Sequence, residues 1–65
     1  MRSKVEILDR DELEEELYYF LTELDNYASP EAWEYIDKLS DKQLVETLNM
    51  FTSGTGTEYR LEKIK

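Results

Sequence analysis

Apolar residues between Asp11 and Ala28 recur at the spacing of an amphipathic helix. At about 100° of rotation per residue they share one face, following the i, i+3, i+4, i+7 pattern. Asp9 or Asp11 can supply the N-cap oxygen, and the acids that follow suit the positive end of the helix dipole. The pattern predicts a first helix over residues 11–28. Its core-directed residues are Leu13, Leu17, Phe20, Leu21, Leu24, Tyr27 and Ala28.

A second, shorter helix is predicted over residues 30–39. Ser29 offers an N-cap, and Pro30 then stands at the first helical position, where proline is favoured. The apolar side of this helix carries Ala32, Trp33, Ile36 and Leu39. Because Trp33 is the largest apolar side chain in the chain, we expect it to anchor the core, with a polar partner for its indole N–H.

A third helix is predicted to begin after Ser40. Ser40 and Gln43 have the spacing of a capping box, in which each side chain bonds the other residue's backbone N–H. The apolar arc of this helix consists of Leu44, Val45, Leu48, Phe51 and the methyl group of Thr52. Met50 falls outside that arc. Ser53 and Gly54 are expected to end the helix, with Gly54 in the left-handed conformation after the last turn.

Alternating apolar and polar residues at both ends of the chain predict two strands. Val5 and Ile7 are the expected half-buried face of a strand in residues 1–8, and residues 58–65 alternate in the same way. Each strand needs a partner for its backbone groups, so we pair the two. The predicted fold class is α+β, a single small acidic helical domain over residues 1–65 in the order β-α-α-α-β, with the terminal strands as a two-stranded sheet. The alternative is a three-helix bundle with a disordered tail.

The charge of the chain is strongly negative and unevenly placed. The 65 residues carry a net charge of −8, while residues 9–41 alone hold twelve acids against Arg10 and Lys38, a net of −10. A field of this sign repels nucleic acid and anionic membrane surfaces and speeds encounter with basic proteins. There is no run of about 18 apolar residues that would span a membrane, and the first residues do not resemble a secretory signal. We therefore expect a cytoplasmic protein that binds neither membrane nor nucleic acid directly.

The residue types argue against an enzyme, a cofactor or a metal site. The chain has no cysteine and no histidine, which removes thiolate ligands and the usual neutral-pH general base. An EF-hand loop starting at Asp9 would need glycine and glutamate where Glu14 and Phe20 stand. Gly54 and Gly56 belong to no phosphate-binding pattern. Paired carboxylates are abundant, but so short a chain has little room for a substrate pocket beside its core.

The acidic face of the first two helices is the candidate site. Tyrosines within a rim of carboxylates suit a protein interface, so we expect an interaction module, either an inhibitor or an adaptor, that docks on a basic partner protein. A special case is a nucleic-acid mimic that occupies the groove of a nucleic-acid-binding protein. The predicted partner-binding residues are Asp11, Glu12, Glu14, Glu15, Tyr18, Tyr19, Thr22, Asp25, Glu34 and Tyr35.

Two other interpretations of the same residues stay open. Acid-rich surfaces also serve solubility alone, and a solvated helix face needs no partner. A function of a different class is that of a structural domain that associates with further copies of itself, since an exposed strand edge is a template for pairing. A homo-oligomer is the expectation under that alternative.

Overall fold

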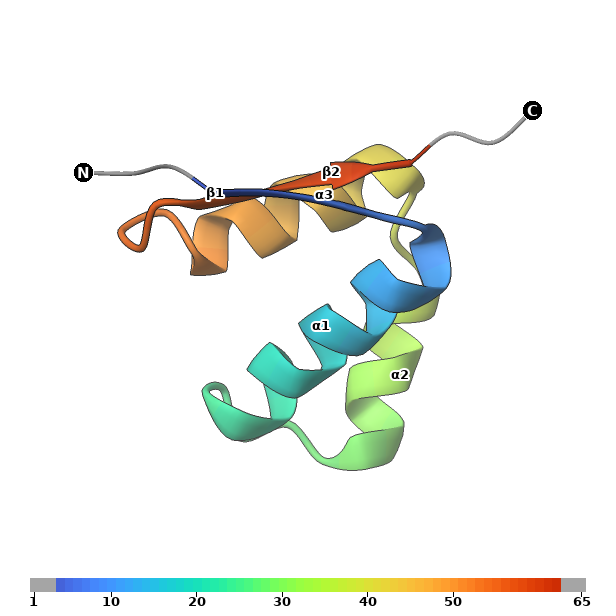
Figure 1. The fold of residues 1–65 in the computed structure, drawn as a ribbon. Coiled ribbons are helices and arrows are strands. Elements are labelled where there is room, and N and C mark those ends of the chain that lie inside the picture. The colour runs from blue at the N-terminus through green and yellow to red at the C-terminus, as the bar shows by residue number, and fades with distance from the viewer. Residues whose placement is uncertain (1–3, 63–65) are drawn as a thin grey trace.

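A computed structural model describes residues 4–62 of the chain as a β-α-α-α-β fold (Figure 1). Strand β1 (Lys4–Leu8) leads into helix α1 (Arg10–Glu23), which is followed by α2 (Ser29–Asp37), α3 (Asp41–Phe51) and strand β2 (Thr57–Leu61). The two strands pair in parallel. The α+β class and the element order predicted from the sequence are confirmed, in place of the alternative three-helix bundle. Within residues 4–62, no helix is long and apolar enough to cross a membrane.

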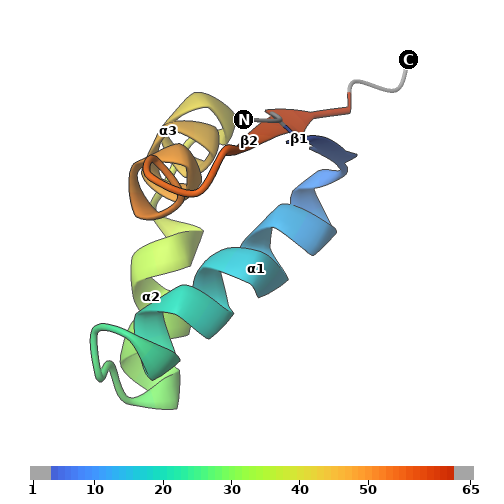
Figure 2. The same ribbon diagram turned by 60° about the vertical axis from the view of Figure 1, so that its left-hand side comes forward.

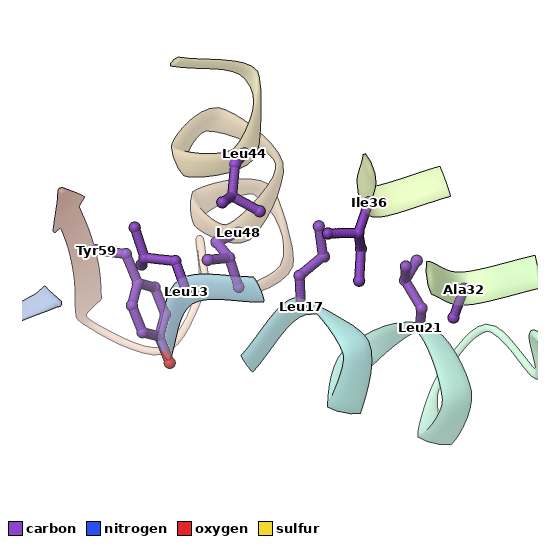
Figure 3. Close-up of a cluster of buried hydrophobic side chains, with 8 residues drawn as sticks. All are labelled: Leu13, Leu17, Leu21, Ala32, Ile36, Leu44, Leu48 and Tyr59. Carbon is purple, nitrogen blue, oxygen red and sulfur yellow. The ribbon is translucent and has the colours of Figure 1, made fainter. Parts of the chain in front are cut away.

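Helix α1 is the element around which the others pack, since it contacts α2, α3 and both strands. The strands lie beside α3, and the α1–α2 pair extends away from them (Figure 1 and Figure 2). Figure 3 shows α1 contributing core residues along its length, from Leu13 beside Tyr59 to Leu21 beside Ala32. Burying one large aliphatic side chain is worth about 1.5–3 kcal/mol. The core consists of Leu13, Leu17, Leu21, Ala32, Ile36, Leu44, Leu48 and Tyr59.

Helix α1 ends at Glu23, so the predicted extension to Ala28 is wrong. Asn26 adopts φ 59° and turns the chain back, and the Tyr27 N–H donates to the Leu21 carbonyl at 3.0 Å. Asparagine tolerates this left-handed conformation better than most residues. As a result Leu24 is 59% exposed instead of lying in the core.

Helix α2 begins one step earlier than predicted, with Ala28 as its N-cap instead of Ser29. The Glu31 carboxylate accepts from the Ala28 N–H at 3.4 Å, while the Ser29 hydroxyl turns to α1. The expectation that Trp33 anchors the core is also wrong, because its side chain is 37% exposed. Core positions follow the i, i+4 spacing from Ala32, which leaves Trp33 at the edge of the buried face.

Helix α3 begins with the predicted capping box and ends differently from the prediction. The Ser40 hydroxyl accepts from the Gln43 backbone N–H at 3.2 Å, and the side-chain amide oxygen of Gln43 accepts from the Ser40 N–H at 3.0 Å. Met50, which falls outside the apolar arc, is 75% exposed. The glycine in the left-handed conformation is Gly56, with φ 84°, and not Gly54. Gly56 ends the turn between α3 and β2. Its carbonyl accepts from the Lys4 N–H at 2.7 Å, and this bond starts the pairing of the two strands.

The inward face of β1 is the opposite of the predicted one. Val5 and Ile7 are 45% and 59% exposed, so the expectation that they form the half-buried face is wrong. The register places Glu6 opposite Tyr59 and Leu8 opposite Leu61, and residues in register share a face. Because Tyr59 is buried in the core, Glu6 and Leu8 face inward with it. The sheet edge leaves the Glu6 carboxylate within 2.8 Å of the Lys4 ammonium group.

Candidate functional site

A stacked pair of aromatic rings joins α1 to α2 on one side of the molecule. The rings of Tyr18 and Trp33 lie 4.7 Å apart with an interplanar angle of 14°. The Tyr18 hydroxyl is 2.8 Å from the Ser29 hydroxyl, which fixes the tyrosine at both ends. Tyr18 is half-buried and packs against the core, whereas Trp33 reaches the surface. Tyr18 and Trp33, which lie 15 residues apart in the chain, therefore form one unit.

Exposed acids lie around this pair. Asp11, Glu15 and Thr22 share the Tyr18 side of α1, at i−7, i−3 and i+4. On α2, the exposed Glu34 is next to Trp33 in the sequence but points away from the buried face of the helix. The Thr22 hydroxyl donates to the Tyr18 carbonyl at 3.0 Å, so its hydrogen bond is made within α1. We call this surface the acidic flank. Its residues are Asp11, Glu14, Glu15, Tyr18, Thr22, Trp33 and Glu34.

Glu14 stands at the border of the acidic flank and is held by Arg10. The Arg10 Nε lies 2.6 Å from Glu14 Oε2, and its Nη1 lies 2.7 Å from Asp41 Oδ1. A third bond runs from Arg10 Nη2 to the Leu39 carbonyl at 2.9 Å. The hydrogen bonds to Glu14 and then to Asp41 raise the pKa of Arg10. Glu14 is therefore committed to joining α1 to the α2–α3 connection.

Two predicted site residues lie on another side of the molecule, near the end of α3. Tyr19 is 57% exposed and packs at 5.7 Å against Phe20, whose ring stacks on Phe51 at 5.4 Å. Asp25 borders a shallow hollow that it shares with Met50 and Phe51. Neither Tyr19 nor Asp25 belongs to the acidic flank.

The two remaining predicted residues have local partners. The Tyr35 ring lies 5.9 Å from the ring of Tyr27, on the side of α2 away from Trp33. Glu12 completes the capping box of α1: its carboxylate accepts from the Asp9 N–H at 3.4 Å, and its own N–H donates to the Asp9 carboxylate at 2.9 Å. The predicted set thus divides among several surfaces, of which the acidic flank gathers the most.

Another hollow, larger than the one beside Asp25, lies between α3 and β2, with a volume of about 440 Å³. It is open and carries charges of both signs. The lining residues are Asp41, Lys42, Val45, Glu46, Arg60 and Leu61. Within residues 4–62, no group of three or more acidic side chains converges as metal ligands would.

Tyr59 has a perturbed titration in the core. Burial, with help from the carboxylates of Glu16 and Glu6, raises the pKa of Tyr59, whose hydroxyl donates to Glu16 at 3.3 Å.

No protein-family model, curated protein or solved structure matches this chain. Function is therefore inferred from the geometry of the chain's own residues. The surface position of Trp33 was not predicted from the sequence. It could have been inferred from the buried i, i+4 pair of Ala32 and Ile36, because Trp33 lies about 100° around the helix from Ala32.

Proposed function

We propose that this protein is an interaction module that docks its acidic flank on a basic surface of a partner protein, as an inhibitor or an adaptor. The observation that carries the proposal is the Tyr18–Trp33 stack, an aromatic pair that reaches the surface among carboxylates. Interfaces commonly combine a central aromatic anchor with a polar rim, and tryptophan and tyrosine dominate their binding energy.

The rigidity of the pair supports this role. Tyr18 is held by Trp33 on its face and by Ser29 at its hydroxyl, so binding need not order it. An anchor that is already ordered avoids the entropy cost of about 0.5–1.5 kcal/mol for immobilising a flexible side chain.

The charge of the flank supports a basic partner. Asp11, Glu15 and Glu34 are exposed, and they lie in the segment that holds most of the acids. Complementary charges accelerate encounter and select against acidic proteins. A partner whose basic surface binds DNA or RNA would make this module a nucleic-acid mimic.

The test compares capture of partners from nuclease-treated lysate by four tagged proteins. They are the native chain, Trp33→Ala, the double variant Glu15→Lys and Glu34→Lys, and a control with the same charge change on other surfaces, Glu46→Lys and Glu58→Lys. We expect one partner to bind the native chain and the control. Trp33→Ala should weaken binding by about 30-fold, the size expected for an interface hot spot.

Equal binding by the native chain and by both flank variants would overturn the proposal. Equal loss in the two charge variants would show that net charge alone attracts the partner and would also count against it. Circular dichroism checks that each variant is folded. Release of the captured partner by added DNA or RNA separates a nucleic-acid mimic from an ordinary adaptor.

A further inference from the structure

The outer edge of β2 is closed by side chains from its neighbours. The Asn49 amide donates to the Tyr59 carbonyl at 3.1 Å and accepts from the Tyr59 N–H at 2.7 Å. The Thr52 hydroxyl donates to the Thr57 carbonyl at 3.0 Å. Helix α3 therefore takes the place of a further strand along this edge.

Among residues 4–62, none covers the outer edge of β1 in this way. The Lys4 N–H donates to the Gly56 carbonyl at 2.7 Å, and the Leu8 carbonyl accepts from the Glu62 N–H at 2.8 Å. In a parallel strand, the backbone groups of alternate residues point to the same neighbour. The N–H and C=O groups of Lys4, Glu6 and Leu8 therefore point to β2. Those of Val5 and Ile7 point to the other edge. Within residues 4–62, no side chain or loop bonds these groups as Asn49 bonds Tyr59.

The surroundings of this edge define the chemistry of a strand that would fit it. On the outer face the strand would lie beside the exposed side chains of Val5 and Ile7. On the inner face Glu6 lies opposite Tyr59, whose hydroxyl meets Glu16 at 3.3 Å. Glu12 precedes Glu16 by one helical turn and shares its side of α1. The inner side of the edge therefore carries carboxylates, of which that of Glu6 is paired with Lys4 at 2.8 Å, and the outer side carries the apolar side chains of Val5 and Ile7.

We propose that the free edge of β1 binds an extended segment of another protein, which adds as a third strand and alternates basic side chains inward with apolar ones outward. Backbone hydrogen bonds would supply affinity and the alternation specificity, as in other cases of strand addition. A second copy fits less well, because it would bring another net charge of −8 and its own Glu6 and Glu16 to the joint. This surface is separate from the acidic flank, and neither proposal depends on the other.

In the test, the native, isotope-labelled chain is titrated with a short peptide that alternates lysine and valine and is blocked at both ends. Binding is followed by the shifts of the amide NMR signals. We expect the largest shifts at Val5 and Ile7, with slower solvent exchange of their amides. A peptide with glutamate for lysine should bind at least about tenfold more weakly. The variant Val5→Pro removes an N–H that the β1–β2 pairing does not use, and proline is tolerated at such edge positions. It should weaken binding of the lysine peptide at least about tenfold.

A second variant, Ile7→Lys, places a cation on the edge without changing the backbone and should also weaken binding of the lysine peptide. If Val5→Pro alters the amide spectrum of the core, Ile7→Lys replaces it as the test of edge binding. Shifts confined to Tyr18 and Trp33 would overturn this proposal while leaving the acidic flank supported. Equal binding of the two peptides would overturn it, as would absence of binding. A mass that doubles with concentration, with Val5 protected in the free chain, would assign the edge to a second copy instead.

Discussion

Arg10 is a cation in the first turn of α1, where the helix dipole disfavours positive charge. Its side chain bonds Glu14 in the same helix and also reaches Asp41 of α3 and the Leu39 carbonyl, at 2.6–2.9 Å. The carbonyl belongs to the segment that follows α2, so a single guanidinium joins three helices. Fixed donors on a planar group make arginine suited to such a junction.

Arg10→Ala should therefore lower the free energy of unfolding by about 1.5–3 kcal/mol, the range for hydrogen bonds to charged groups. The measurement is urea denaturation. Arg60→Ala is the matched control, since the Arg60 side chain is 60% exposed and pairs with nearby Glu58 at the surface. Its effect should stay within about 0.5 kcal/mol. Similar losses in the two variants would contradict the role assigned to Arg10.

Tyr59 makes stability depend on alkaline pH. Its pKa is raised above the ordinary 10.0 by burial and by the carboxylates of Glu16 and Glu6. The unfolded chain then releases the phenolic proton at lower pH than the folded one, so the stability it contributes is present below about pH 10 and is lost as pH rises through the folded pKa. Tyr59→Phe should lose less stability than the native chain between pH 9 and pH 11, measured by urea midpoints. An unchanged slope would contradict this account.

At the scale of elements, the sequence predicted the features that depend on residues close together in the chain. The capping box of Ser40 and Gln43 and the i, i+4 spacing of Leu44 and Leu48 correctly predicted the start and the buried face of α3, because each depends on neighbours in the chain. The face of β1 could not be found in this way. It is set by pairing with Tyr59, a contact across the whole chain. For the candidate site, the acids could be predicted from charge, but the Tyr18–Trp33 stack depends on how α1 meets α2.

The closure of β2 by α3 depends on both ends of the Asn49 amide. Asn49→Asp keeps an acceptor for the Tyr59 N–H but sets a carboxylate oxygen against the Tyr59 carbonyl, so we expect a loss of about 1–3 kcal/mol. Urea denaturation at pH 7 measures it. Protonating the new carboxyl at acid pH restores a donor, and a loss that persists unchanged at pH 4 would contradict this explanation.

Amide exchange should alternate along β1. The N–H groups of Glu6 and Leu8 face β2, whereas those of Val5 and Ile7 face the open edge. We expect exchange of Val5 and Ile7 to be at least about tenfold faster in dilute solution, by hydrogen-exchange NMR. Uniform protection along the strand would show that something covers the edge.

At the scale of the whole molecule, like charges act against the compact state. Twelve acids lie in residues 9–41, and the net charge of the chain is −8. Salt screens repulsion between exposed charges over about 10 Å at 0.1 M. Raising sodium chloride from 10 to 300 mM should therefore raise the urea midpoint, in spite of weakening the Arg10 ion pairs. A falling midpoint would show that attractive pairs outweigh the repulsion.

The parallel pairing of β1 and β2 has a mechanical consequence. Their directions put the start of β1 and the end of β2 at opposite ends of the sheet (Figure 1). A pulling force applied through these two points drives the strands to slide past each other, so all the hydrogen bonds between them bear the load together. Strands opened from one end would instead lose these bonds one after another. The two-stranded sheet thus acts as a clamp against tension between these two points of the chain.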